Sequence, residues 1–439
     1  IYRFLHDRVQ QAAYRLIGED EKQSSHLKIG QRLLDYATEN EREKNLFEIV
    51  NHLNTGVALI AEPTQINRLC QLNLRAGQKA KASTAYTSAN QYLTAGIDLL
   101  GPNCWQNQYS LALNLYESAA ETALLCGDFE QMEQWAEIVQ NNTVTLLDQI
   151  KIYELQIQAS TSQNQVLAAI SIAVKVLHQL GVTFPTQPNP NDIQQAFQAT
   201  AKLLAGQNIS ALADLPAMIS AEQLAVMRLT ASIIPAAFIG MPPLFPLIIL
   251  SQIRATIEHG NAPISAYSYA AYGLLCNIIL NDIAAADQFG QLALDLSFDL
   301  PSKELKAKVC FVVGAFIKHH TGPLSESLSL LRHSYQMALE CGDLEYVGYT
   351  AFHICHNAYL MGNELTGLEI SISAYNQVLA NFKQRMTLNY GEMCQQAVLN
   401  LIHACPKPYL LKGENFDEES VLPQLLAAND RTGLYQIYT

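Results

Sequence analysis

The sequence predicts an all-α protein, and three observations lead to this fold class. Most of the 439 residues place apolar side chains at i, i+3, i+4 and i+7, the spacing of one helix face. Strand-like sequence is nearly absent after residue 5. Helix-start signals recur at Pro63-Thr64, at Asp192 with Gln195 three residues later, and at Ser220. We therefore expect packed helices and essentially no sheet beyond residues 1–5.

Helix-ending signals recur about every 40 residues. They form two series, one at Gly101, Asn141 and Gly181 and another at Asp282, Gly322 and Gly362. A unit of this length holds a helix–turn–helix pair, and stacked pairs form an α-solenoid of the tetratricopeptide-like or HEAT-like kind. We expect these pairs to turn near residues 127, 163, 282, 322 and 362.

Small residues favour the tetratricopeptide-like interpretation. Ala119 and Ala120 lie in the first expected helix of one pair and Ala136 in the second, where helices that cross closely need small side chains. No unit matches the 34-residue consensus strictly, so the repeats are degenerate and slightly long. The predicted fold is a tetratricopeptide-like superhelix of antiparallel helix pairs.

A Pro- and Asn-rich stretch, residues 184–192, divides the predicted array. We expect five segments: an N-terminal segment 1–60, a first repeat block 61–183, the linker 184–192, a helical connector 193–260, and a second repeat block 261–439. The last residues begin a helix after Asp430 that stops early, so we expect both ends to be cut from a longer protein.

Composition excludes some partners. The net charge of −13 and the absence of any long basic run argue against nucleic acid, because phosphate binding needs clustered Lys and Arg. Nine scattered cysteines without a CxxC pair are typical of reduced thiols in a cytoplasmic protein.

Residues 229–250 carry no charge and are long enough to cross a bilayer. Four prolines, at positions 235, 242, 243 and 246, would break such a span. We therefore expect two short buried helices joined by the turn GMPP and no membrane span.

Catalytic motifs are missing from the sequence. It contains no GxxxxGK[ST] phosphate loop, no kinase HRD or DFG motif, no HExxH and no GxSxG. An enzyme built on a toroid of helices would need acid–base residues or metal ligands that come together at one site. The sequence shows no such set. We expect no catalytic residues and no bound cofactor in this chain.

Two clusters could still bind a ligand. His353, Cys355 and His356 are candidate zinc ligands, since His353 and His356 share a helix face, but packing between repeats is favoured because no carboxylate or CxxC supports them. Tyr267, Tyr269 and Tyr272 could line a groove for a ligand or peptide, or could pack in the seam between repeats with their hydroxyls at its edge.

The N-terminus places a His-Asp pair before an amphipathic helix. Asp7 has Gln10 three residues later, which is capping-box spacing, so we expect Asp7 to cap this helix. His6 then lies just outside the helix N-terminus, where free amides and the helix dipole favour an anion.

The segment FLHDRVQQAAYRLI resembles the end of the winged-helix module in STAND-class signalling ATPases. Together with SSHLKIGQRLL, FEIVNHLNTGVALI, EHGNAPISAYSYAAYGLLC, ALECGDLEYVGYTAFHICHNAYLMGNEL and LKGENFDEESVLPQLL, it resembles large bacterial multidomain signalling kinases, best known from cyanobacteria. The resemblance covers nearly the whole chain. It implies a remnant of a winged-helix module at the N-terminus, followed by the helical-repeat region.

In that family a Ser/Thr kinase domain and an ATPase precede the repeats, and GAF and histidine-kinase modules follow them. The resemblance implies a parent protein that uses ATP or ADP with magnesium, and a contact of His6 with the β-phosphate of ADP. It implies a regulatory sensor or interaction scaffold whose partners are proteins, peptides or other domains of the same chain. The alternative is the inducer-binding solenoid of a STAND-type transcriptional activator, in which a similar solenoid binds an inducer sugar. A DNA-binding module would reveal it.

Overall fold

The computed structural model describes residues 14–298, 300–403 and 405–438. They fold into two compact units, Ile1–Thr143 and Val144–Thr439. His6 and Asp7 lie outside the described residues, so the predicted cap and phosphate contact stay predictions. The boundary between the units falls inside the range 61–183 that the sequence suggested as one block.

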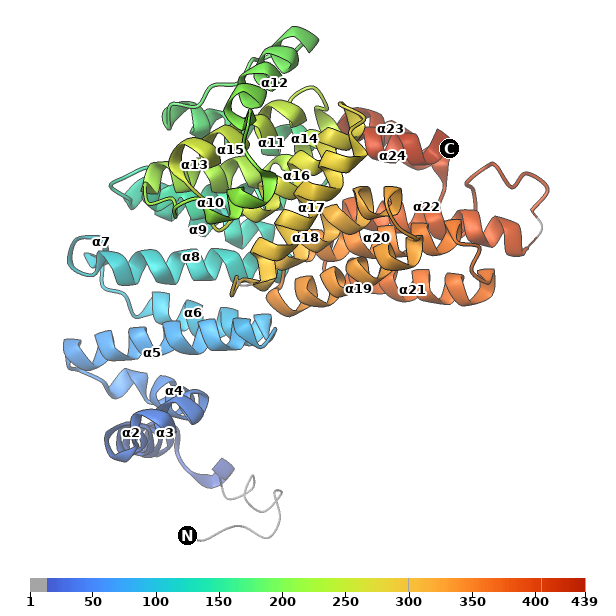
Figure 1. Ribbon diagram of the computed structural model, residues 1–439. Helices are drawn as coiled ribbons and strands as arrows, with labels where there is room; N and C mark the ends of the chain where they lie inside the picture. The colour runs from blue at the N-terminus through green and yellow to red at the C-terminus, as the bar shows by residue number, and fades with distance from the viewer. Residues whose placement is uncertain (1–13, 299, 404, 439) are drawn as a thin grey trace. The chain divides into compact units, whose positions relative to one another are not determined.

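Unit 1 consists of helices that pack in sequential order (Figure 1, blue to cyan). They are α2 (Glu19–Tyr36), α3 (Glu39–Lys44), α4 (Leu46–Thr55), η1 (Val57–Leu59), α5 (Pro63–Ala82), α6 (Tyr86–Asp98), α7 (Cys104–Asn107), α8 (Tyr109–Leu125) and α9 (Phe129–Asn142). Pairs α5–α6 and α8–α9 are antiparallel neighbours. A core that includes Ile49, Val50 and Leu69 joins α4 to α5.

Unit 2 contains the remaining helices around one large core. They are η2 (Leu147–Gln149), α10 (Ile150–Ser162), α11 (Val166–Gln179), α12 (Pro190–Leu204), η3 (Ile209–Asp214), α13 (Ala221–Ser232), α14 (Ile234–Gly240), α15 (Phe245–His259), α16 (Ser265–Ile278), α17 (Ile283–Phe298), α18 (Lys303–Phe316), η4 (Lys318–His320), α19 (Leu324–Cys341), α20 (Leu344–Leu360), α21 (Leu365–Asn381), α22 (Arg385–Ile402), α23 (Glu418–Ala428) and α24 (Arg431–Tyr438).

Helices α16, α18, α20 and α22 pack one against the next and form what we call the inner row. Helices α17, α19 and α21 each pair with a member of this row. A glycine permits close approach within the array. At Gly391 on α22, an added Cβ would collide with the side chain of Asn376 on α21. The small residue therefore sets how closely these two helices cross.

One turn geometry recurs throughout both units. A residue with positive φ follows the helix, and the next amide donates to the carbonyl five residues earlier, which satisfies the exposed helix end. This bond joins Ala85 to Ala80, Asp128 to Ala123, Gln165 to Ser160, Asp343 to Ala338, Asn363 to Ala358 and Gln384 to Leu379. The positive-φ positions are Thr84, Gly127, Asn164, Gly342, Gly362 and Lys383.

The predicted all-α solenoid is confirmed. No strand occurs in the described residues, which contain only the isolated bridges Ala217–Asn261 and Lys412–Asp417. Helices turn near 127, 163, 282, 322 and 362, as the period predicted. Neighbouring helices pack in pairs along the chain.

The start of α12 corrects one local prediction. The helix begins at Pro190 and not after Asp192, because Asn189 accepts bonds from the amides of Asn191 and Asp192. Asp192 completes a capping box by accepting from the amide of Asn189. The predicted linker also starts inside the core, since Phe184 is 9% exposed.

The apolar stretch 229–250 lies in α13, α14 and α15, with a break at residues 241–244. By length and composition alone, Ala221–Gly240 is apolar enough to cross a membrane, but 67% of its most apolar window is buried inside the protein. A buried core helix passes the same test. The described residues therefore contain no clear membrane span.

Candidate functional site

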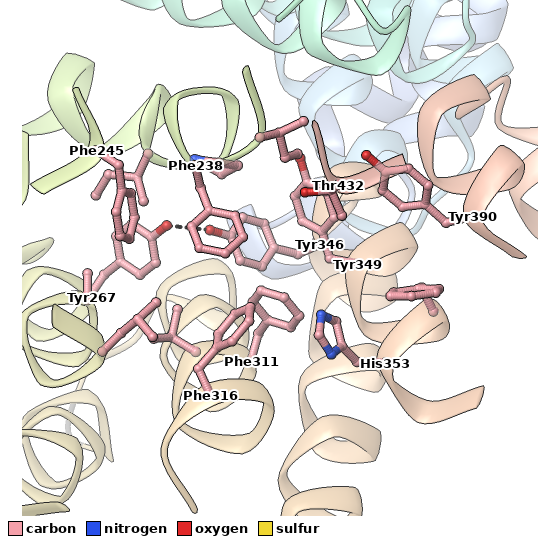
Figure 2. A pocket seen from close by; sticks show the side chains of 17 residues that line it. Phe238, Phe245, Tyr267, Phe311, Phe316, Tyr346, Tyr349, His353, Tyr390 and Thr432 are labelled. Carbon is pink, nitrogen blue, oxygen red and sulfur yellow. Dashed lines mark hydrogen bonds between the residues drawn. The ribbon is translucent and has the colours of Figure 1, made fainter. Parts of the chain in front are cut away.

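An aromatic cavity lies within unit 2, between the inner row and helices α14, α15 and α24 (Figure 2). Its space free of protein atoms is about 630 Å³, part of it continuous with solvent. Aromatic side chains from α14, α15, α16, α18, α20 and α22 line it. The main ones are Phe238, Tyr267, Phe311, Phe316, Tyr349 and Tyr390.

Helix α20 supplies half of the polar side chains that line the cavity. Tyr346, Tyr349 and His353 are separated by three and four residues, so they project from one face of the helix. The ring of Phe311 on α18 meets all three, with centroid distances of 5.4 Å to Tyr346, 5.9 Å to Tyr349 and 5.3 Å to His353. Phe316 lies 5.3 Å from His353. These contacts hold α18 and α20 in register and form one wall of the cavity.

The tyrosine hydroxyls are hydrogen-bonded within the wall. The oxygens of Tyr267 and Tyr346 are 2.6 Å apart (Figure 2, dashed line). Tyr349 donates to Glu345 Oε1 at 2.9 Å, and Tyr390 donates to Asp430 Oδ1 at 2.7 Å. Burial raises the pKa of each of these phenols, so they stay neutral at physiological pH.

A charged cluster stands behind Tyr346. Lys308 Nζ is 2.6 Å from Glu304 Oε1, 3.4 Å from Asp343 Oδ2 and 5.2 Å from the centre of the Tyr346 ring. Burial acts against the charge of Lys308, but the carboxylates of Glu304 and Asp343 outweigh it and raise its pKa. Burial and the charge of Asp343 raise the pKa of Glu345 to about 7. These four side chains do not line the cavity.

His353 is a lining side chain with unused hydrogen-bonding capacity. It contacts Phe311, Phe316 and Phe352 through ring edges, and no hydrogen bond joins it to another described residue. Burial and the neighbouring His356 lower its pKa to about 3, so the ring is neutral near pH 7. A neutral imidazole offers one donor and one acceptor.

Helix α16 places the tyrosines of the predicted groove, Tyr267, Tyr269 and Tyr272, on different faces. Tyr267 lines the cavity. Tyr269 donates to Asn261 Oδ1 at 3.1 Å and stacks on Phe289, while Tyr272 meets the same Phe289 ring edge-on at 4.8 Å. The three tyrosines therefore do not share one groove.

The predicted metal candidates are dispersed as well. His353 faces the cavity, but Cys355 packs in a separate apolar cluster with Leu368 and Ile372. His356 lies against the ring of Phe352 at 5.6 Å. In the part of the chain that the structure describes, no group of three or more His, Cys, Asp or Glu side chains could hold a metal ion.

The lining residues Phe311, Tyr349 and Tyr390 were missed by sequence reasoning, although a signal for them exists. Together with Tyr267, which the sequence did suggest, they follow one another at intervals of 44, 38 and 41 residues, close to the repeat length. An aromatic residue that recurs once per repeat marks one surface of a solenoid. Phe238 and Thr432 carry no such signal.

The comparisons with known proteins agree with a signalling role. No protein-family profile matches the chain. The chain is 23% identical over 404 residues to hybrid signal transduction histidine kinase G of Dictyostelium discoideum, a match that covers 82% of this chain. It spans 12% of the length of that relative. The likeness supports a signalling context.

Proposed function

We propose that this chain is a ligand-responsive regulatory segment of a multidomain signalling kinase, acting by binding and not by catalysis. Over 82% of its length, the chain matches a small part of a hybrid signal transduction histidine kinase, and this match carries the proposal. A helical-repeat region with an internal cavity is suited to such a task, because a solenoid can shift the register of stacked helices when a cavity is filled.

The finer parts of the proposal come from the resemblance found in the sequence. The parent protein would be a cytoplasmic Ser/Thr kinase with a STAND-type ATPase that binds ATP or ADP with magnesium, followed by GAF and histidine-kinase modules. Within it, His6 would contact the β-phosphate of ADP, and the helical repeats would bind a partner protein, a peptide or other domains of the same chain. Residues 1–60 would complete a winged-helix module.

The chemistry of the cavity supports binding. Its phenols have raised pKa values and their hydroxyls are engaged, so they are poor nucleophiles and poor acids. His353 has no carboxylate within hydrogen-bonding reach to orient it, as a general base would require. What remains is an apolar enclosure with a few hydrogen-bonding groups, which is typical of a ligand pocket.

The transcriptional-activator alternative receives less support from the cavity. A sugar inducer presents many hydroxyls, and each would need a polar partner when it is desolvated. The lining offers mostly hydrocarbon and ring surface.

The test uses the full-length protein encoded by the gene that contains this chain. Phosphorylation from labelled ATP is measured for the wild type, for a deletion of residues 144–439, and for Ala271→Leu. Ala271 on α16 lines the cavity, so the larger side chain would fill part of it. The proposal expects both changes to alter the phosphorylation rate at least twofold. His356→Phe, outside the cavity, is the matched control. Equal rates in all proteins would contradict a regulatory role.

A further inference from the structure

We infer that the aromatic cavity binds a neutral ligand of one or two rings that carries a hydroxyl or carbonyl group. The inference rests on the proposed function only in calling the site regulatory, and the binding itself is independent of any kinase. Three features of the cavity lead to this class of ligand: the shape of its apolar surface, its free hydrogen-bonding groups, and the placement of nearby charges.

The apolar surface favours flat rings. Phe311 and Tyr349 are stacked with an interplanar angle of 27°, whereas Phe316 stands edge-on to Phe311 at 87°. Figure 2 shows these rings facing the space that Tyr267 and Phe238 border from the other side. Rings in such an arrangement offer both faces and edges, which suits an aromatic or similarly flat guest. Because the 630 Å³ includes open solvent, the enclosed space is smaller and limits the guest to a small ring system.

Three polar groups remain available to such a guest, and one of them is the hydroxyl of Thr432, which lines the cavity. The Tyr267–Tyr346 pair has two hydroxyl protons, and only one of them can lie between the two oxygens. The other proton has no acceptor among the described residues. His353, on the opposite side of the view in Figure 2, adds a ring nitrogen. A single hydroxyl or carbonyl on the ligand would form a hydrogen bond with one of these groups. Without a ligand, a water molecule would have to form this bond.

The surrounding charges exclude ionic ligands. No Lys or Arg side chain is among the described residues that line the cavity, so an anion would find no counter-charge there. Asp430 Oδ2 has no hydrogen-bond partner among the described residues, but neither Asp430 nor the carboxyl groups of Glu304, Asp343 and Glu345 line the cavity. A cation in the cavity would therefore be desolvated without a carboxylate in contact with it. A neutral guest avoids both costs.

The experiment compares four probes on one ring skeleton against the purified chain. They are 1-naphthol, naphthalene, 1-naphthoate and 1-naphthylmethylammonium, measured by ligand-observed NMR and by fluorescence titration. We expect 1-naphthol to bind most tightly, naphthalene about five- to tenfold more weakly for the loss of one hydrogen bond, and both ions at least tenfold more weakly than naphthol. Tight binding of either ion, or no saturable binding of naphthol, would overturn the inference.

Variants locate the site. His353→Phe keeps the ring but removes the hydrogen-bonding nitrogens, so we expect naphthol to fall to the affinity of naphthalene while naphthalene still binds. Retained naphthalene binding shows that the variant is folded. His356→Phe, three residues later and outside the cavity, is the matched control and should leave both affinities unchanged. Unchanged naphthol affinity in both His353→Phe and Ala271→Leu would place binding elsewhere and contradict the inference.

The outcomes separate this inference from the proposed function. If naphthol binds as described but phosphorylation by the full-length protein does not respond to it or to cavity variants, the binding site stands and the regulatory role fails. If cavity variants change phosphorylation while no probe binds, the regulatory role stands and the ligand class is wrong.

Discussion

Tyr390 on α22 donates a hydrogen bond of 2.7 Å to Asp430, which in turn caps the first turn of α24 by accepting from the amide of Gly433 at 2.7 Å. The same Tyr390 ring lines the cavity. Next to Asp430, the side chain of Asn429 donates to the carbonyl of Gly240 at 2.5 Å. These polar contacts, together with the fully buried Leu425, attach the C-terminal helices α23 and α24 to the inner row and to α14.

Tyr390→Phe should loosen this attachment. The variant removes one hydrogen bond to a buried carboxylate, which costs about 1.5–3 kcal/mol of unfolding free energy. We expect a lower denaturant midpoint and faster amide hydrogen exchange at 418–438 than in the wild type. Tyr272→Phe, whose ring lies outside the cavity, is the control. Unchanged exchange in 418–438 would show that the bond does not hold these helices.

Glu345→Gln should stabilise the protein more at high pH than at low pH. Burial raises the pKa of Glu345 to about 7, so the folded state favours the protonated form and loses stability as pH rises from about 4.5 through 7. Glutamine still accepts the bond from Tyr349 but cannot ionise. We expect a gain of about 1–2 kcal/mol at pH 8 and little gain at pH 4.5. Thermal unfolding at both pH values tests this, and a pH-independent difference would contradict it.

His353→Phe should reduce the acid sensitivity of the fold. The folded-state pKa of about 3 lies below the usual 6.5, so the unfolded chain gains a proton first and stability is lost as pH falls below about 6.5. The variant should lose about 1–2 kcal/mol less than the wild type between pH 7 and 5. His333→Gln, at an exposed position on α19, is the control for the loss of one histidine. Parallel stability curves for wild type and His353→Phe would refute this assignment.

Gly391→Ala should destabilise the pairing of α21 with α22. The added methyl group would meet the side chain of the buried Asn376, which donates to Gln395 Oε1 at 2.9 Å. Overpacking of this kind costs roughly 1–3 kcal/mol. Gly101→Ala, where an added Cβ meets nothing within 4 Å, is the control. Equal denaturant midpoints for the two variants would show that the crossing adapts without cost.

Helices and turns were predictable because their determinants are local. A turn such as that at Gly342 depends on one residue with positive φ and one amide that reaches back five positions, so it can be read from a few letters. The start of α12 was misplaced by three residues because Asn189 and Asp192 are both good capping residues. Only their reciprocal bonds identify Asn189 as the cap.

The site was predictable only in part. Residues two and five positions apart on a helix point about 140–160° away from each other, so Tyr269 and Tyr272 could not join Tyr267 on one wall. Tyr346, Tyr349 and His353 have the spacing of one face, but nothing local shows that this face is enclosed. The sequence by itself determined the helices, their turns and the repeat period, because these depend on neighbours within about five residues. Tertiary structure alone decided the cavity. The residues that line it include Phe238 and Thr432, which are far apart in the sequence. They come together only through the way that all the helices between them stack.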